Sequence, residues 1–191
     1  MIEFIIEGPH GAGKSTLAKQ YCRDFQVLYK KQNSKSFCNL AENAKTDLRT
    51  LDLLFKKQWD FMESNHSSDI LCVLDRSLLS SVVYQQVQSP EHKKICDYWL
   101  ERFKDWMVKS EVPVFFMSTS ANDIHERRLK RGDKMNDDEI TEVYKEISAY
   151  SRVFYTLEGT HLVFFGTLTF NNCKAPSCRK KYILDKIRKE A

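Results

Sequence analysis

The 191-residue sequence contains few glycines and prolines, six and four respectively, and it has no long apolar run. This composition excludes collagen-like and low-complexity chains, which need glycine and proline in quantity. No stretch approaches the roughly 20 apolar residues that a membrane-spanning helix requires. The sequence begins directly with a strand-like pattern, so we expect no signal peptide, no membrane contact and a cytoplasmic protein.

Two local features of the composition, the cysteines and the excess positive charge, do not define a site by themselves. Of six cysteines only Cys173 and Cys178 lie close together, and the second pair that a zinc site usually needs is missing. Seven of the 30 lysines and arginines fall within residues 174–190, against two acidic residues. We interpret this basic C-terminal segment, 174–191, as a solvated helix, with a nucleic-acid-binding patch as the alternative.

Half of the few glycines fall in one motif near the start of the chain. Residues 8–15 read Gly-Pro-His-Gly-Ala-Gly-Lys-Ser, a complete match to the phosphate-binding loop pattern, between an apolar strand and a helical segment. The glycines let successive backbone N–H groups face one phosphate chain, where the helix N-terminus adds partial positive charge. We expect Lys14 to contact the β- and γ-phosphates of ATP and Ser15 to hold Mg²⁺. The predicted ATP-binding residues of the loop are Gly8, Gly11, Ala12, Gly13, Lys14, Ser15 and Thr16. The alternative is a glycine turn in some other α/β protein.

The rest of the chain alternates apolar strand-like runs with amphipathic helical segments. The expected strands are 2–6, 26–29, 70–74, 112–117 and 162–165. The expected helices are 15–24, 46–64, 78–88, 95–107, 122–131, 137–154 and 182–189. Such alternation predicts a three-layer α/β fold with about five mainly parallel strands and helices on both faces. No linker or repeat divides the chain, so residues 1–191 are predicted to form one domain, with ligands at the carboxyl ends of the strands.

A charged triplet, Asp75-Arg76-Ser77, follows the third strand, which we expect to lie beside the first. Asp75 is therefore placed to bind Mg²⁺ together with Ser15. Arg76 would present a fixed planar cation to the transferred phosphoryl group or to an acceptor phosphate. The alternative is an Asp–Arg pair that caps the next helix.

Three segments together resemble the thymidylate kinase family of P-loop kinases. Residues 7–16, Glu-Gly-Pro-His-Gly-Ala-Gly-Lys-Ser-Thr, look like the family's opening motif, which many kinases share. Residues 75–85, Asp-Arg-Ser-Leu-Leu-Ser-Ser-Val-Val-Tyr-Gln, resemble its Asp-Arg-Tyr segment, and residues 126–133 resemble its lid. The resemblance runs from residue 2 to about 166 and implies a P-loop kinase fold with a helical lid at about 122–138. It also covers residues 53–55, Leu-Leu-Phe.

The resemblance implies ATP-dependent phosphoryl transfer to a small nucleotide acceptor. Arg76 would hold the acceptor α-phosphate, and Phe55 would stack on its base. The lid arginines Arg127, Arg128 and Arg131 would close over ATP and neutralise the charge that builds during transfer, and Arg127 would also cover the adenine. The implied catalytic residues are Glu7, Lys14, Arg76, Arg128 and Arg131. The implied acceptor-binding residues are His10, Phe55, Trp59, Arg76, Tyr84 and Gln85.

Three residues depart from the family pattern, all on the acceptor side. His10 stands where the family usually has Asp, Trp59 replaces a thymine-reading Arg, and Ser77 replaces the Tyr of Asp-Arg-Tyr. The hypothesis that follows is an acceptor other than plain thymidylate, such as a different or modified pyrimidine deoxynucleotide.

Other readings stay open from the sequence. A deoxynucleoside kinase resembles the same scaffold, and Glu7 would then act as base on a 5′-hydroxyl. A kinase that acts on a nucleic-acid end or a modified base in DNA would use the basic tail. A homodimer is compatible with the resemblance, although we assign the aromatic face of Trp99, Phe103 and Trp106 to the core.

Overall fold

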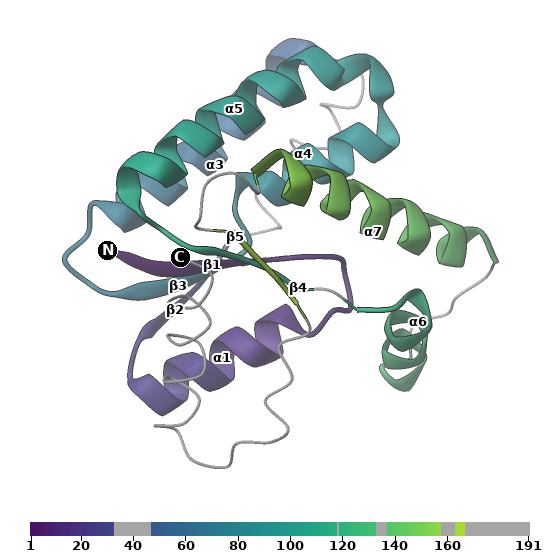
Figure 1. Ribbon diagram of the computed structural model, residues 1–191, viewed down its shortest axis with the longest axis horizontal. Coiled ribbons are helices and arrows are strands. Elements are labelled where there is room, and N and C mark those ends of the chain that lie inside the picture. Colours follow the sequence, from purple (N-terminus) through teal and green to yellow (C-terminus); the bar gives the residue numbers. More distant parts are fainter. Residues whose placement is uncertain (33–46, 118, 133–136, 158–162, 167–191) are drawn as a thin grey trace.

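Five parallel strands form one sheet at the centre of the molecule, as the sequence predicts (Figure 1). The computed structural model describes residues 1–32, 47–117, 119–132, 137–157 and 163–166. The strands are β1 (Ile2–Glu7), β2 (Leu28–Lys31), β3 (Cys72–Asp75), β4 (Val114–Met117) and β5 (Val163–Gly166). They lie in the order β2-β3-β1-β4-β5, and each neighbouring pair is parallel. β1 therefore occupies the middle of the sheet, the position that its nearly continuous apolar sequence favours.

Helices cover both faces of this sheet, which confirms the three-layer α/β architecture. The helices are α1 (Lys14–Phe25), α3 (Leu48–His66), α4 (Leu78–Gln88), α5 (Lys93–Ser110), α6 (Ala121–Lys130) and α7 (Asp137–Leu157), with a 3₁₀ turn η1 (Pro90–His92). Figure 1 shows α1 on one face and α3, α4, α5 and α7 on the other. A separate apolar core lies on each side of the sheet. α6, the start of the predicted lid, follows β4 and packs against α7 through Ile124 and Val143.

Several predicted boundaries need correction. The second strand is 28–31 rather than 26–29, because Gln26 ends α1 in a left-handed conformation with φ 55°. Ile70 and Leu71 precede β3 and are exposed, so the fully buried run is shorter than the sequence suggests. The predicted terminal helix, the basic segment 174–191, Cys173 and Cys178 lie outside the described residues.

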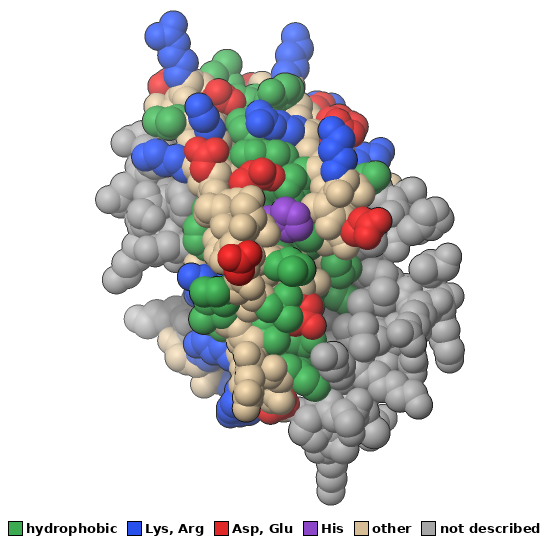
Figure 2. All heavy atoms as spheres, turned by 90° about the vertical axis from the view of Figure 1, so that its left-hand side faces the viewer, with side chains coloured by type: hydrophobic (Ala, Val, Ile, Leu, Met, Phe, Trp, Pro, Cys, Tyr) green, Lys and Arg blue, Asp and Glu red, His purple; other side chains and the backbone are tan. Residues whose placement is uncertain are grey.

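The aromatic face of α5 belongs to the core, as predicted, since Trp99, Phe103 and Trp106 are buried. Within the described residues, no helix is long and apolar enough to cross a membrane. On the face shown in Figure 2, basic and acidic side chains are interspersed around a central apolar stripe. That face therefore offers no surface of a single charge sign.

Candidate active site

The glycine loop lies at the carboxyl edge of the sheet, between β1 and α1. Ile6 of β1 pairs with Asp75 of β3, and Glu7 pairs with Phe116 of β4. Because the strands are parallel, their carboxyl ends and the loops that follow converge at this edge. The predicted adjacency of the loop and the triplet 75–77 is confirmed.

Three glycines of the loop have backbone conformations that other residues rarely adopt. The φ angles of Gly8, Gly11 and Gly13 are 137°, 92° and 91°. A Cβ atom on Gly8 would also lie only 2.8 Å from the carbonyl oxygen of Met117. These positions require glycine, and they bring the loop close to the end of β4.

The Lys14 side chain folds back over the loop. Its Nζ donates to the carbonyl oxygen of Pro9 at 2.5 Å, and the residue is only 4% exposed. Burial and the neighbouring Arg76 lower the pKa of Lys14 to about 7. A buried ammonium with one carbonyl partner is poorly compensated, so an anionic ligand would stabilise its charged form. Thr16 lies exposed in the first turn of α1.

Ser15 and Asp75 meet beside the loop. Asp75 Oδ2 accepts hydrogen bonds from Ser15 Oγ and Tyr29 Oη, both at 2.5 Å. Asp75 Oδ1 is buried and has no hydrogen-bond partner within the described part of the chain. Mg²⁺ prefers oxygen ligands, and commonly one or two carboxylates hold it together with substrate phosphates. The Ser15 hydroxyl and the unpartnered Asp75 Oδ1 are oxygen donors of this kind, so the two residues fit a magnesium site that phosphate oxygens would complete.

Arg76 is fixed in place despite an unfavourable backbone conformation. Its φ is 77°, which is rare for a residue other than glycine. Its Nη1 donates to Ser80 Oγ at 2.8 Å and to Tyr150 Oη at 2.9 Å, and the guanidinium lies 5.5 Å from the centre of the Tyr84 ring. Ser77, rather than Asp75 or Arg76, caps α4, so the structure gives no support to a capping pair. Strain of this kind is retained where the surroundings impose it, often at functional sites.

Glu7 holds the turn at residues 75–77 through hydrogen bonds from Ser77 and Ser80. The residue is fully buried; its Oε1 accepts from the Ser77 N–H and Ser77 Oγ, and its Oε2 accepts from Ser80 Oγ, each at 2.6 Å. Burial raises the pKa of Glu7 against the opposing effect of these hydrogen bonds. The role of Glu7 as a base stays a prediction; what the structure shows is a carboxylate that holds the turn through Ser77 and Ser80 and would have to leave these partners to accept a proton from a sugar hydroxyl.

Two lid arginines contact the loop backbone. Arg127 Nη1 donates to the Ala12 carbonyl oxygen at 3.2 Å, and Arg128 Nη2 donates to the His10 carbonyl oxygen at 3.4 Å. Arg128 also lies 4.0 Å from a carboxylate oxygen of Glu146. The structure therefore brings α6 to the loop, where the sequence predicts these cations to act.

The His10 ring lies among cations. His10 is exposed to solvent, but partial desolvation of its ring and then the charges of Arg128, Arg76, Lys14 and Arg131 lower the pKa of His10 to about 4. The ring is therefore neutral at physiological pH in the absence of ligands. This result identifies Arg131 as part of the same cationic surroundings.

Two predicted acceptor residues lie elsewhere. Phe55 is fully buried, with its ring 6.1 Å from that of Trp99, so it has no exposed face to stack on a base. Trp59 packs between α3 and α5 against Trp99 and Trp106, with the Arg102 guanidinium 4.5 Å from its ring centre. Both predictions are wrong because Phe55 and Trp59 lie on the side of α3 that packs against α5 and the apolar core.

A third predicted acceptor residue, Gln85, points away from the loop, and Tyr84 does not. Gln85 is buried, and its Nε2 contacts His92 Nδ1 at 2.8 Å. From α3, it is Gln58 that reaches α4, where its Nε2 donates to Ser81 Oγ at 2.6 Å. The Tyr84 ring remains beside Arg76.

Three residues of the site have no recognisable signature in the sequence. Tyr29 contacts Asp75, Tyr150 contacts Arg76, and Glu146 accepts from the His10 N–H at 2.6 Å and from Tyr84 Oη at 2.5 Å. Tyr150 and Glu146 lie on α7, far from the loop in sequence, in a segment that reads as an ordinary amphipathic helix. Tertiary packing alone brings them here.

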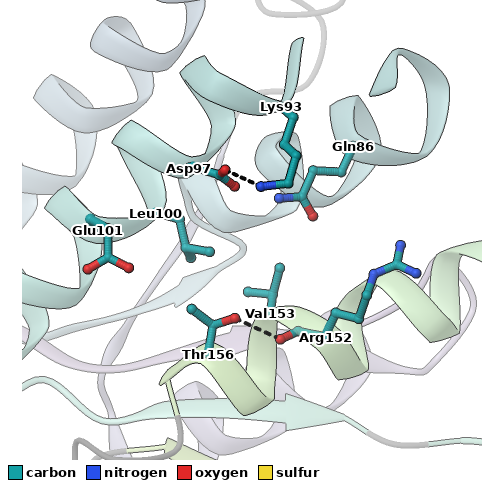
Figure 3. Close-up of a pocket in the computed structure, with 8 residues that line it drawn as sticks. All are labelled: Gln86, Lys93, Asp97, Leu100, Glu101, Arg152, Val153 and Thr156. Atoms are coloured by element: carbon teal, nitrogen blue, oxygen red, sulfur yellow. Dashed lines mark hydrogen bonds and ion pairs between the residues drawn. The ribbon is translucent and has the colours of Figure 1, made fainter. Parts of the chain in front are cut away.

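A hollow in the described structure lies away from this edge, among α4, α5 and α7 (Figure 3). Its volume is about 380 Å³. Figure 3 shows Lys93 paired with Asp97 on one side and Arg152 and Thr156 on the other. None of the predicted site residues lines it.

Comparison of the whole chain with solved structures identifies the fold. A deoxyadenosine kinase from M. mycoides, with the products dCMP and dCDP bound, superposes with a TM-score of 0.64 at 14% identity, covering 99% of this chain and 100% of that one. The YorR protein from Bacillus subtilis gives 0.61 at 19% identity, covering 100% and 99%. A thymidylate kinase from Candida albicans gives 0.60 at 15% identity, covering 100% and 93%. No protein-family model and no curated protein sequence matches the chain. At these identities the likeness establishes the fold, which is that of the P-loop nucleotide kinases.

Proposed function

We propose that the protein transfers the γ-phosphoryl group of ATP to a deoxynucleoside monophosphate. The observation that carries this proposal is the convergence of Lys14, the Ser15–Asp75 pair and Arg76 at one sheet edge. In phosphoryl transfer the protein supplies positioning and charge stabilisation rather than covalent chemistry, and these residues suit that role. We further propose that residues 1–191 work as one domain with the lid at about 122–138.

The donor half consists of the loop, α1 and the lid arginines. The loop N–H groups and Lys14 would bind the ATP phosphates, and Lys14 would give up its contact with Pro9 to do so. Mg²⁺ held by Ser15 and Asp75 would neutralise phosphate charge. Arg127 and Arg128 already contact the loop, and they would exchange backbone carbonyls for phosphate oxygens.

The acceptor half is organised around Arg76 and Tyr84. A guanidinium fixed by Ser80 and Tyr150 is preorganised for a phosphate, which it binds more strongly than it binds a neutral hydroxyl. A monophosphate is already ionised and needs no base, whereas a sugar hydroxyl does. Glu7, the base expected for a nucleoside acceptor, is buried and would have to give up its hydrogen bonds with Ser77 and Ser80 to act on a sugar hydroxyl. This difference favours the monophosphate.

A deoxynucleoside kinase is the second candidate, and one observation favours it. The exposed side chain of His10 stands on the loop that contacts Glu146 and Arg128, and its lowered pKa favours the neutral ring, which suits a sugar hydroxyl better than a second phosphate. The solved deoxyadenosine kinase shares the fold, which allows this activity without demonstrating it.

An ADP-release assay over paired deoxynucleosides and monophosphates, including 5-substituted pyrimidines, tests the proposal. We expect monophosphates to support turnover and nucleosides to be poor, with no strict preference for thymidylate. Faster turnover of nucleosides than of monophosphates would instead support a deoxynucleoside kinase. Stimulation by DNA ends, with binding that falls steeply with salt, would instead support a nucleic-acid kinase.

A further inference from the structure

Glu146 of α7 joins the donor and acceptor halves of the site. One of its carboxylate oxygens, Oε1, accepts from the His10 N–H of the loop and from Tyr84 Oη of α4. The other, Oε2, lies 4.0 Å from Arg128 Nη2 of α6. The residue is only 6% exposed. A single buried carboxylate therefore contacts the loop, the acceptor helix and the lid.

The partners of Glu146 are those that a phosphoryl group would use. Backbone N–H groups of a glycine loop are anion donors, and a lid arginine is a phosphate-binding cation. Arg128 Nε is also buried, and within the described residues it lacks a hydrogen-bond partner. The Glu146 carboxylate thus fills an anion position only partly and leaves one charged donor unsatisfied.

A comparison with Glu7 indicates that Glu146 can be displaced from its hydrogen-bond donors by a bound substrate. Glu7 is fully buried, accepts three hydrogen bonds and faces the turn at Ser77 and Ser80. Glu146 has two neutral donors and a long ion pair, all from groups that border the substrates. Breaking the contacts of Glu146 costs little free energy if a substrate then accepts hydrogen bonds from the same donors. Breaking the hydrogen bonds of Glu7 would leave the turn at Ser77 and Ser80 without its acceptor.

We propose that Glu146 is an internal anion that occupies the His10 N–H and Arg128 until both substrates are bound. The inference rests on the proposed phosphoryl transfer. While Glu146 stays in place, the loop N–H and the arginine are withheld from the γ-phosphate, so ATP is hydrolysed slowly by water. An acceptor that contacts Tyr84 removes one partner of Glu146, and the carboxylate then yields the remaining donors to the phosphoryl group. Glu146 is in these terms a positioning residue that couples ATP use to acceptor binding.

The Glu146→Gln variant tests this role, with Glu142→Gln as its matched control. Glu142 lies on the same helix, is exposed and pairs with Lys145, away from the loop. Gln keeps the shape and one acceptor oxygen but removes the charge that opposes phosphate. We expect acceptor-free ATP hydrolysis to rise roughly five- to 20-fold in Glu146→Gln, which is the lower part of the range of typical coupling between two sites. Acceptor-dependent transfer should persist, and ATP affinity should increase.

The outcomes separate the inference from the proposed function. ATP binding to the wild-type protein is measured first, and its absence would overturn both. If ATP binds, equal losses of hydrolysis and transfer in Glu146→Gln, or no change in either, would overturn the role of Glu146 alone. Should that variant fail to fold, Tyr84→Phe removes one donor to Glu146 Oε1 and is expected to raise acceptor-free hydrolysis in the same direction. Unchanged hydrolysis in Tyr84→Phe would equally contradict the inference.

Discussion

The donor side and the acceptor side of the site are built in different ways. The centre of the donor side is one continuous stretch, in which β1, the loop and α1 place Lys14 and Ser15 through local backbone geometry, while Asp75 and the arginines of α6 are added from elsewhere. The acceptor side draws on the turn after β3, on α4 and on α7, and its polar groups are set by contacts such as Arg76 with Tyr150. A local motif therefore carries the donor chemistry, whereas tertiary packing decides which side chains face the acceptor.

The largest expected effect lies on the donor side. Lys14→Ala should lower turnover about 1,000-fold, the upper range for losing one charge-stabilising donor, while the fold stays intact. Steady-state ADP release and circular dichroism measure the two properties. Lys145→Ala, on the exposed surface of α7, is the control. Retained activity in Lys14→Ala would remove the basis of the donor assignment.

Arg76→Ala should separate the two sides. Because Arg76 is placed at the acceptor, we expect the acceptor KM to rise about 100-fold, as for truncation of a buried charged partner, with little change in ATP affinity. Initial rates at varied acceptor and calorimetric ATP binding give the two quantities. Arg102→Ala, which removes an exposed arginine stacked on Trp59 and Trp99, is the control. An equal loss of affinity for the acceptor and for ATP would show that Arg76 does not act on the acceptor side alone.

Tyr29→Phe tests whether the donor side extends to β2. Loss of the hydrogen bond to Asp75 should change the Mg²⁺ concentration for half-maximal activity about threefold to tenfold, in line with one net hydrogen bond. A magnesium titration at saturating ATP measures this value. Tyr21→Phe removes an equivalent hydroxyl that donates to Glu3 and should leave the titration unchanged. Identical curves for both variants would confine the metal site to Ser15 and Asp75.

The smallest effect on activity is expected for Phe55→Leu. Since Phe55 lies in the core, the free energy of unfolding should fall by about 1–2 kcal/mol, with the acceptor KM unchanged. Denaturant unfolding and initial rates test this expectation, with the exposed Leu53→Ala as control. A large rise in KM at unchanged stability would return Phe55 to the acceptor site.

The sequence was sufficient for the parts of the molecule that local chemistry determines. The sheet, its neighbouring strands, the loop and the Ser15–Asp75 pair follow from apolar periodicity and from residues that only certain backbones permit. Phe55 and Trp59 could not be placed from the sequence, because an aromatic residue on an amphipathic helix has the same sequence spacing whether it faces a ligand or a neighbouring helix.

Glu146 and Tyr29 were missed for a related reason. Their roles depend on partners more than 40 positions away in the chain, such as His10 and Asp75. Spacing within a segment contains no information about such contacts. The position of Glu7 next to the loop predicts a catalytic role, whereas the direction of its side chain depends on hydrogen bonds from Ser77 and Ser80, which are distant in sequence.

The contacts that Lys14, Arg127 and Arg128 make with loop carbonyls have a consequence for measurements of ligand binding. These cations, together with Glu146, already have partners within the protein. Each phosphate contact therefore replaces an internal contact, and the free energy gained on binding is a difference between the two. The melting temperature of the protein should accordingly rise less with ATP than the number of new contacts suggests, and a modest thermal shift would be no sign of a wrong ligand.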